Sequence, residues 1–182
     1  MPRRTLAAAS ILILTLGALQ GLAHAGSGPT PYDACFNEVG AHYSINPLLL
    51  KAIARQESSM NPRALGQNTN GTVDIGLMQI NSAHLPRLER AGITREHLND
   101  PCINILVGGW VLADAVRRFG MSWKAVGVYH SPTEWRQRDY AARIQRHLRR
   151  EIEALPSLEA ALPAKDQESR ERLLAMAPSP EA

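Results

Sequence analysis

The sequence predicts a mainly α-helical protein with one folded domain. Apolar residues recur at helical spacing in several segments between residues 33 and 152, bounded by polar caps and by glycine or proline breaks. The segments that could form strands lie only within residues 66–81. The chain has 182 residues, which leaves enough for a single domain with its own core once a leader and a tail are subtracted.

The first 25 residues have the pattern of a secretory signal peptide. Arg3 and Arg4 form a charged start, residues 6–19 form a mostly apolar run, and Ala-His-Ala at 23–25 fits a small-x-small cleavage site. The alternative is a retained membrane anchor, although the apolar run is short for a bilayer span. We therefore expect export and a mature chain that begins near Gly26.

Capping residues and apolar stripes predict the helices in order. Expected helices cover residues 33–43, 46–57, 100–119, 122–129 and 134–152. Asp33, Asp100 and Ser122 are the expected N-caps of three of them, and Pro47 fits the first turn of another because its missing N–H costs nothing there. Gly120 would end the helix that begins after Asp100.

The expected apolar faces define the core. In the helix over 100–119 the face comprises Ile105, Gly109, Leu112, Val116 and Phe119. The pair Gly108-Gly109 would weaken an exposed helix but allows a neighbour to approach closely in a packed one. In the last helix the apolar contacts are Trp135, Ala142, Leu148 and Ile152.

The segments between the helices are less regular. Residues 66–74 are rich in Gly, Asn and Thr and predict a loop or a short hairpin. The run GLMQIN at 76–81 fits either a strand or the start of a buried helix, because periodicity cannot separate the two over so few residues. Residues 83–98 form a polar connection with room for a short helix.

Charge is concentrated in the last helix. The net charge of +3 includes Arg3 and Arg4, so it falls to +1 without the leader. Residues 136–150 hold six arginines against one acid, Asp139, which indicates either a solvated face or a contact for an acidic polymer such as cell-wall glycan. Aromatic interleaving and zinc patterns are missing from the sequence, so we do not expect nucleic-acid binding.

Cys35 and Cys102 are the two cysteines of the chain. Export would place them where disulfides persist, so we expect one intramolecular bridge between the first mature helix and a later one. The alternative is a pair of free buried thiols. Their spacing matches no metal site.

The C-terminal residues 153–182 are expected to form an acidic, Ala- and Pro-rich tail. From Pro156 onward the composition shifts, with five acids against three bases. Such a segment buries too little apolar surface to offset the entropy of ordering, so we expect disorder. The folded domain would then cover residues 26–152.

Glu57 is the candidate catalytic acid. At 100° per residue it falls on the same helical stripe as Leu50, Ile53 and Ala54, which must face the core. A carboxyl group held against apolar surface has a raised pKa, as a general acid needs at neutral pH. The same pattern also fits a glutamate just past the helix end and exposed to solvent.

Several motifs in combination resemble a known family. Glu57-Ser58, GLMQI about twenty residues later, VYHS at 128–131 and then Tyr140 follow the order found in lytic transglycosylase domains of the goose-lysozyme-like fold. The layout with an early cysteine, DIGLMQIN and DPCxNI is similar to the small specialised lytic transglycosylases that accompany secretion, conjugation and pilus machines. The resemblance covers about residues 33–150.

The resemblance implies a lysozyme-like single domain and a peptidoglycan substrate. Glu57 would protonate the β-1,4 glycosidic oxygen between N-acetylmuramic acid (MurNAc) and N-acetylglucosamine (GlcNAc), then act as base for the muramyl 6-hydroxyl, which closes a 1,6-anhydro ring. Water is not consumed, so a second carboxylate is not required. The implied protein is periplasmic and monomeric, needs no cofactor or metal, and has an envelope-spanning machine as a partner.

The resemblance also implies substrate-binding roles for six further residues: Ser58, Met78, Gln79, Tyr129, His130 and Tyr140. Ser58 would contact the muramyl unit, and Met78 and Gln79 would line the glycan groove, where a sugar could be the partner that the Gln79 amide needs. One of the two tyrosines would orient Glu57, and either could instead be a packed ring with its hydroxyl at the surface. His130 stands where many relatives have asparagine, and its role is open between glycan binding and packing.

Two alternatives to this function remain at the level of the sequence. Asp74 could approach Glu57 and hold a water on the opposite sugar face, which would make the enzyme an inverting muramidase. We expect Asp74 instead to be a loop residue that hydrogen-bonds its own backbone. The second alternative is a glycan-binding assembly factor with negligible cleavage activity, for which the basic last helix and the acidic tail are the motivation.

Overall fold

The computed structural model describes residues 29–155 and confirms the mainly α-helical class. Within these residues the helices are α1 (Asp33–Tyr43), α2 (Pro47–Ser58), α3 (Leu85–Arg90), α4 (Pro101–Phe119), α5 (Trp123–His130) and α6 (Glu134–Glu153). The strands are β1 (Leu65–Gln67), β2 (Val73–Ile75) and β3 (Ile80–Asn81), followed by the 3₁₀ helices η1 (Ser82–His84) and η2 (Glu96–Asn99). The expected leader and residues 156–182 of the expected tail lie outside the described part.

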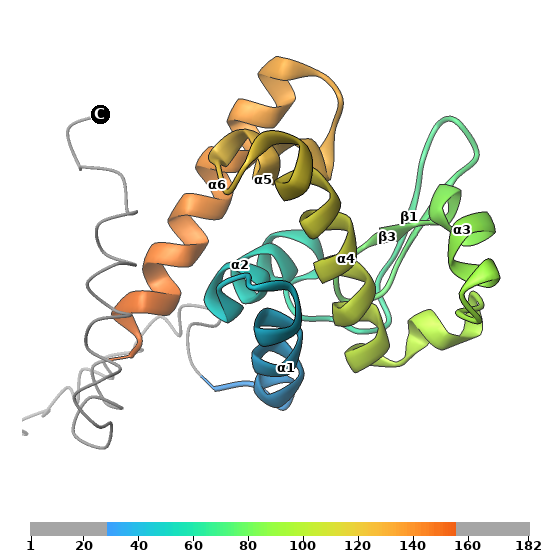
Figure 1. Ribbon diagram of the computed structural model, residues 1–182, viewed down its shortest axis with the longest axis horizontal. Coiled ribbons are helices and arrows are strands. Elements are labelled where there is room, and N and C mark those ends of the chain that lie inside the picture. Colours follow the sequence, from blue (N-terminus) through green and yellow to red (C-terminus); the bar gives the residue numbers. More distant parts are fainter. Residues whose placement is uncertain (1–28, 156–182) are drawn as a thin grey trace, which may run out of the picture.

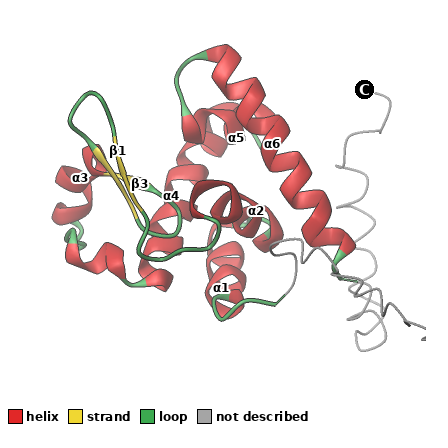
Figure 2. Ribbon diagram, turned by 180° about the vertical axis from the view of Figure 1, so that it is seen from behind, coloured by secondary structure: helices red, strands yellow, loops and turns green. Residues whose placement is uncertain are grey.

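The helices form a cluster with the sheet to one side. Figures 1 and 2 both show α1, α2, α5 and α6 on one side of α4, and the three-stranded sheet with α3 on the other. Helix α6 packs along both α5 and α2, and α4 packs against α1 and α5. None of the described helices combines the length and apolar character that a membrane span requires.

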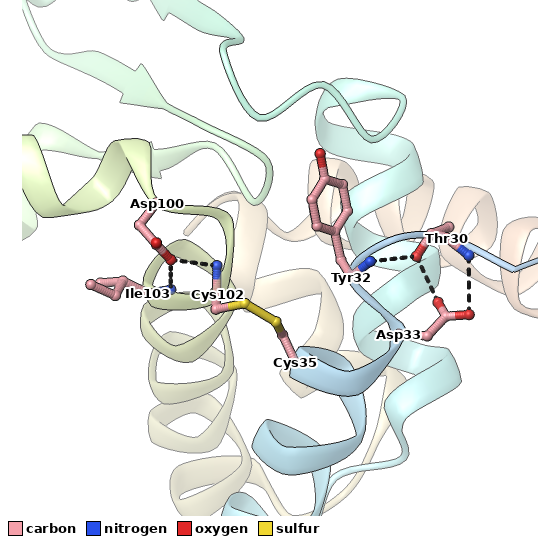
Figure 3. The surroundings of a disulfide bond; sticks show 7 residues. All are labelled: Thr30, Tyr32, Asp33, Cys35, Asp100, Cys102 and Ile103. Carbon is pink, nitrogen blue, oxygen red and sulfur yellow. Dashed lines mark hydrogen bonds between the residues drawn. A yellow bond between two sulfur atoms is a disulfide. The ribbon is translucent and has the colours of Figure 1, made fainter.

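Two of the three expected N-caps, Asp100 and Ser122, are confirmed, Asp33 is wrong, and Asn46, expected as the first residue of its helix, is instead a cap. The side chains of Asn46, Asp100 and Ser122 each accept hydrogen bonds from backbone N–H groups in the first turn of α2, α4 and α5. Asp33, however, lies inside α1 rather than capping it. Its carboxylate accepts hydrogen bonds from the amide and hydroxyl of Thr30 (Figure 3), so it stabilises the chain that enters the helix.

The expected disulfide joins Cys35 in α1 to Cys102 in the first turn of α4. Figure 3 shows it beside the Asp100 carboxylate, which accepts hydrogen bonds from the amides of Cys102 and Ile103. Two segments 67 residues apart in sequence are therefore fixed to one another at the N-terminal ends of their helices.

The glycine pair of α4 marks a close approach, as expected. A Cβ on Gly108 would lie 2.7 Å from the end of the Met78 side chain, and one on Gly109 would lie 2.4 Å from a Val39 methyl. These distances are too short for non-bonded carbons, so both positions require glycine for α1 and the 76–79 segment to pack here.

Residues 66–81 form two short hairpins. The sheet order is β1-β2-β3, with Asp74 of β2 paired to Gly66 on one side and to Asn81 on the other. The hairpin expected over 66–74 is therefore present. Neither alternative for 76–81 is right as a whole: Gly76–Gln79 is a four-residue turn with positive φ at both ends, 76° and 50°, and only Ile80 and Asn81 are extended.

Two expected core residues lie at the surface. The Phe119 side chain is 38% exposed and that of Trp135 is 60% exposed. Both lie at a helix end, where the apolar stripe runs past its neighbours: Phe119 is the last residue of α4 and Trp135 the second of α6. The buried face of α6 instead comprises Tyr140, Ala141, Ile144, Leu148 and Ile152, with the polar residues Gln137 and Glu151.

A buried ionic cluster joins three helices. Glu151 of α6 is 2% exposed and receives Arg55 Nε at 2.5 Å and Lys51 Nζ at 3.5 Å, both from α2. Lys51 also pairs with Asp33 of α1 at 2.9 Å. A buried carboxylate must be paired in this way to avoid a large desolvation cost, so the cluster fixes how α6 lies against α2.

Candidate active site

Glu57 lies in a polar cavity of about 270 Å³ that the helices and the sheet build together. Its lining residues come from α2, the hairpins, α4, α5 and α6: Glu57, Asn68, Asp74, Gln79, Ile80, Asn81, His84, Val111, Tyr129, His130, Ser131 and Arg136. Among the described residues, no group of His, Cys, Asp and Glu is arranged to hold a metal ion.

The position of Glu57 follows from the apolar stripe of α2. Leu50, Ile53 and Ala54 are fully buried, and Glu57 is one turn further on, the last residue but one of the helix. Ser59 then ends the helix in the left-handed conformation, so the chain turns away directly after the acid. Glu57 is thus inside the helix and partly buried, which contradicts the alternative of an exposed residue beyond its end.

The carboxyl group of Glu57 is tuned for proton transfer near neutrality. Burial raises the pKa of Glu57 to about 7, from an ordinary value of 4.5. A hydrogen bond from Tyr140 and the charge of Arg143 lower this pKa, whereas the charge of Asp74 raises it. Glu57 therefore retains, close to neutral pH, the proton that a general acid must donate and that an ordinary glutamate would have lost.

The two tyrosines have different partners. The Tyr140 hydroxyl donates to Oε1 of Glu57 at 2.5 Å, and the Tyr129 hydroxyl donates to the Met78 carbonyl at 2.8 Å. Burial raises the pKa of both phenols well above 10, so both are donors at neutral pH. Tyr140 is therefore the residue that contacts the acid, and Tyr129 supports the turn beside it.

The turn Gly76–Gln79 is held in place from several sides. The Ser58 hydroxyl donates to the Leu77 carbonyl at 2.7 Å, which links the end of α2 to the turn. The Gln79 amide nitrogen donates to the carbonyls of Gly76 and Ala64, so both of its protons are used inside the protein. Gln79 lines the cavity, and the protein's own backbone holds its amide nitrogen in place.

The side chain of Met78 does not reach the cavity. It is fully buried and lies against Gly108 of α4. The expectation that Met78 lines a glycan groove is therefore wrong for its side chain. The Met78 side chain fills the space that Gly108 leaves open, and this packing holds the turn Gly76–Gln79 against α4.

Asn104 is a site residue that the sequence interpretation missed. It lies in α4, is fully buried, and accepts a hydrogen bond from the Met78 amide at 2.7 Å. Its own amide donates to the carbonyls of Ile75 and Leu98 at 3.0 and 2.9 Å. An asparagine next to Ile105, on the core side of an apolar helix, was the signal that could have identified it.

Asp74 faces the cavity from strand β2. Its two carboxylate oxygens accept hydrogen bonds from the side-chain amides of Asn68 at 2.9 Å and Asn81 at 2.7 Å. The expectation that Asp74 is a loop residue is wrong, because it lies in a strand, and so is the expectation that it bonds its own backbone. The strand directs its side chain into the space that Glu57 also lines.

Three basic residues complete the cavity. His130 is exposed and stacks on the Tyr140 ring, with centroids 4.6 Å apart and planes 4° apart. Its burial on one face and the charges of Arg143 and Arg136 lower the pKa of His130. His84 of η1 and Arg136 of α6 also line the cavity.

Comparison with known proteins agrees with this geometry. Residues 34–147 match the family model of the transglycosylase SLT domain. The chain is 41% identical to the invasion protein IagB of Salmonella typhi over 126 residues, 66% of this chain and 79% of that protein. It is 45% identical to the X polypeptide of Escherichia coli over 98 residues (53% and 58%) and 39% identical to the protein IpgF of Shigella flexneri over 100 residues (54% and 66%).

The match extends over the elements that build the cavity, from α1 to the third turn of α6 and beyond. It therefore includes the acid at the end of α2, the turn, and the tyrosine that contacts the acid. The chain belongs to the transglycosylase SLT domain family and is a peptidoglycan lytic transglycosylase.

Proposed function

We propose that this enzyme cleaves the MurNAc–GlcNAc bond of peptidoglycan without water and leaves a 1,6-anhydro-muramyl end. The observation that carries the proposal is the environment of Glu57, a carboxyl group with a pKa of about 7 that one phenol contacts directly. A single group of this kind can act first as an acid and then as a base.

The reaction uses Glu57 twice. The protonated carboxyl donates its proton to the glycosidic oxygen as the bond from that oxygen to the muramyl anomeric carbon breaks. The resulting carboxylate then removes the proton from the muramyl 6-hydroxyl while that oxygen bonds to the anomeric carbon. Glu57 ends protonated, so the cycle is balanced without water or a second acid.

Tyr140 stabilises the carboxylate form of Glu57 in this cycle. Its hydrogen bond to Oε1 stabilises the carboxylate that forms when the proton leaves, and so opposes the effect of burial. Asp74 acts in the opposite direction, because a nearby negative charge disfavours a second one. The pKa of Glu57 thus results from opposed contributions of burial, of Tyr140 and Arg143 in α6, and of Asp74 in β2.

Mass spectrometry of digested peptidoglycan tests the proposal. We expect anhydro-muramyl ends, one water lighter than reducing ends, and we expect their loss in E57Q, which keeps the shape of the side chain but cannot transfer a proton. E38Q is the matched control, because Glu38 lies on the exposed face of α1. Reducing ends as the main product would contradict the proposal.

Hydrolysis is the second candidate, and the orientation of Asp74 favours it. A carboxylate that lines the same cavity as the acid could hold an attacking water. Digestion in H₂¹⁸O separates the two reactions, since only hydrolysis incorporates the label. Under our proposal D74N still produces unlabelled anhydro ends, whereas a hydrolase would produce labelled ends that disappear in D74N.

We also propose that the enzyme is exported to the periplasm and opens the wall locally for an envelope-spanning apparatus. The signal-like residues 1–25, the disulfide and the name of the relative called an invasion protein support this. Intact mass of protein from the periplasmic fraction should give a chain that begins near Gly26. A cytoplasmic full-length chain would contradict export while leaving the proposed reaction intact.

A further inference from the structure

Arg136 is a cation in the wall of the active-site cavity. It is the third residue of α6, is exposed, and lines the same space as Glu57 and Asp74. Its guanidinium lies 5.3 Å from the centre of the Trp135 ring, which is itself 60% exposed. The indole therefore supports one face of the guanidinium and limits its freedom at the edge of the cavity.

Other arginines of this helix pair with an acid one turn earlier. Arg138 pairs with Glu134, and Arg143 pairs with Asp139. The residues four positions from Arg136 are Pro132 and Tyr140, which have no charge. Within residues 29–155 the structure gives Arg136 no carboxylate partner, so its N–H donors remain available to a ligand.

The two acids of the cavity are already engaged. Glu57 accepts from Tyr140, and the two oxygens of Asp74 accept from Asn68 and Asn81. A ligand with a negative charge would be repelled by Asp74 and attracted by Arg136. Arg136 is therefore a group of the cavity wall that favours an anion and has no carboxylate partner within residues 29–155.

We propose that Arg136 is a specificity residue that binds a carboxylate carried on the 3-O-substituent of a muramyl unit. This inference rests on the proposed peptidoglycan substrate. Peptidoglycan differs from uncharged glycans such as chitin by these carboxylates, which occur either on the bare lactyl group or on the stem peptide. A guanidinium presents a planar pair of N–H donors that matches a carboxylate, and the indole beneath it reduces the entropy lost on binding.

Binding to the inactive E57Q form of the full chain tests this assignment. The ligands are chitotetraose, a GlcNAc–MurNAc tetrasaccharide with free lactyl carboxylates, and the same tetrasaccharide with stem peptides, each measured by calorimetry. In E57Q/R136Q we expect affinity for at least one muramyl ligand to fall by about five- to tenfold, the range of a partly exposed charge-assisted hydrogen bond, with no change for chitotetraose. The muramyl ligand that loses more affinity identifies the source of the carboxylate.

The control is R138Q in the same background, since Arg138 lies half a turn further along α6 and is paired with Glu134. It should leave all three affinities unchanged. Methyl esterification of the lactyl groups should weaken binding to E57Q and abolish the difference between E57Q and E57Q/R136Q, if the bare lactyl group is the source. Equal weakening for chitotetraose, or no weakening for either muramyl ligand, would overturn the role of Arg136. Failure of E57Q itself to bind any muramyl ligand would instead contradict the proposed function.

Discussion

The Tyr140 hydroxyl contacts Oε1 of Glu57 across 83 positions of the sequence. The tyrosine is 1% exposed and its ring is fixed by His130 on one face, so the hydroxyl has little freedom to leave the acid. Since this bond lowers the pKa of Glu57 while burial raises it, the protonation of the acid depends on a contact between the second helix and the last.

Replacement of Tyr140 by phenylalanine should move the pH dependence of activity. Without the donor the carboxylate is less stable, so the pKa of Glu57 rises further and the alkaline limb of kcat/KM shifts to higher pH. The rate constant should fall by about ten- to a hundredfold, because a charge-assisted bond is lost from the charged intermediate state. Y129F, which loses a bond to Met78 instead, should lower activity without this shift. An unshifted limb in Y140F would show that the contact does not tune the acid.

Glu57 should also make stability depend on pH. Its folded pKa of about 7 exceeds its ordinary value of 4.5, so the folded protein binds this proton more tightly than the unfolded chain. The stabilising contribution is complete below about pH 4.5 and is lost as the pH rises through about 7. E57Q has no titrating group at this position and lacks this loss. The free energy of unfolding of E57Q minus that of the parent should therefore increase by on the order of 2–3 kcal/mol between about pH 4 and about pH 8. Urea unfolding at the two pH values measures this, and a difference that does not vary with pH would contradict it.

Asn104 should affect both stability and catalysis from outside the cavity. N104A leaves the Met78 amide and two carbonyls without their partner, which should lower the free energy of unfolding by about 2–4 kcal/mol. N104D keeps an acceptor for Met78 but loses the two donors, so it should lie between N104A and the parent. N37A, at an exposed position of α1, is the control. Unfolding by urea and turnover of peptidoglycan measure the two effects, and full activity in N104A would rule out a role in positioning the turn.

Loss of the disulfide should destabilise the domain without altering its chemistry. In the chain-entropy model a bridge across 67 positions contributes roughly 4 kcal/mol. Urea unfolding of the variant C35S/C102S should give a free energy of unfolding that is lower than the parent's by about this amount, whether or not a reductant is present. Its activity on peptidoglycan under mild conditions should match that of the parent. If reductant destabilised the double variant as much as the parent, the effect could not be assigned to this bond.

The sequence predicted best those features that depend on neighbouring residues. The starts of three helices followed from Pro47, Asp100-Pro101 and Ser122, because a cap or a first-turn proline acts within one turn. The burial of Glu57 followed from the period of α2. The prediction of Asp33 as an N-cap was wrong because its carboxylate oxygens accept hydrogen bonds from Thr30, just before the helix.

Site features that depend on distant residues could not be predicted in the same way. Nothing in the pattern distinguishes Tyr129 from Tyr140 as the partner of the acid, since that choice depends on how α6 packs on α2. The backbone acceptors of the Gln79 amide nitrogen, Gly76 and Ala64, could not be predicted, because the positive-φ turn that brings them to it leaves no periodic pattern. Asp74 was misassigned because its strand is only three residues long.

Helix α6 is the last element of the described domain to be synthesised, and this affects when the acid becomes competent. It contributes Tyr140 and Arg143, which both lower the pKa of Glu57, and Glu151, the buried carboxylate that Lys51 and Arg55 neutralise. A nascent chain that ends before residue 140 has Glu57 without the hydrogen bond from Tyr140, and has Lys51 and Arg55 without the Glu151 carboxylate. The order of synthesis therefore delays a wall-cleaving activity until the entire domain has been made.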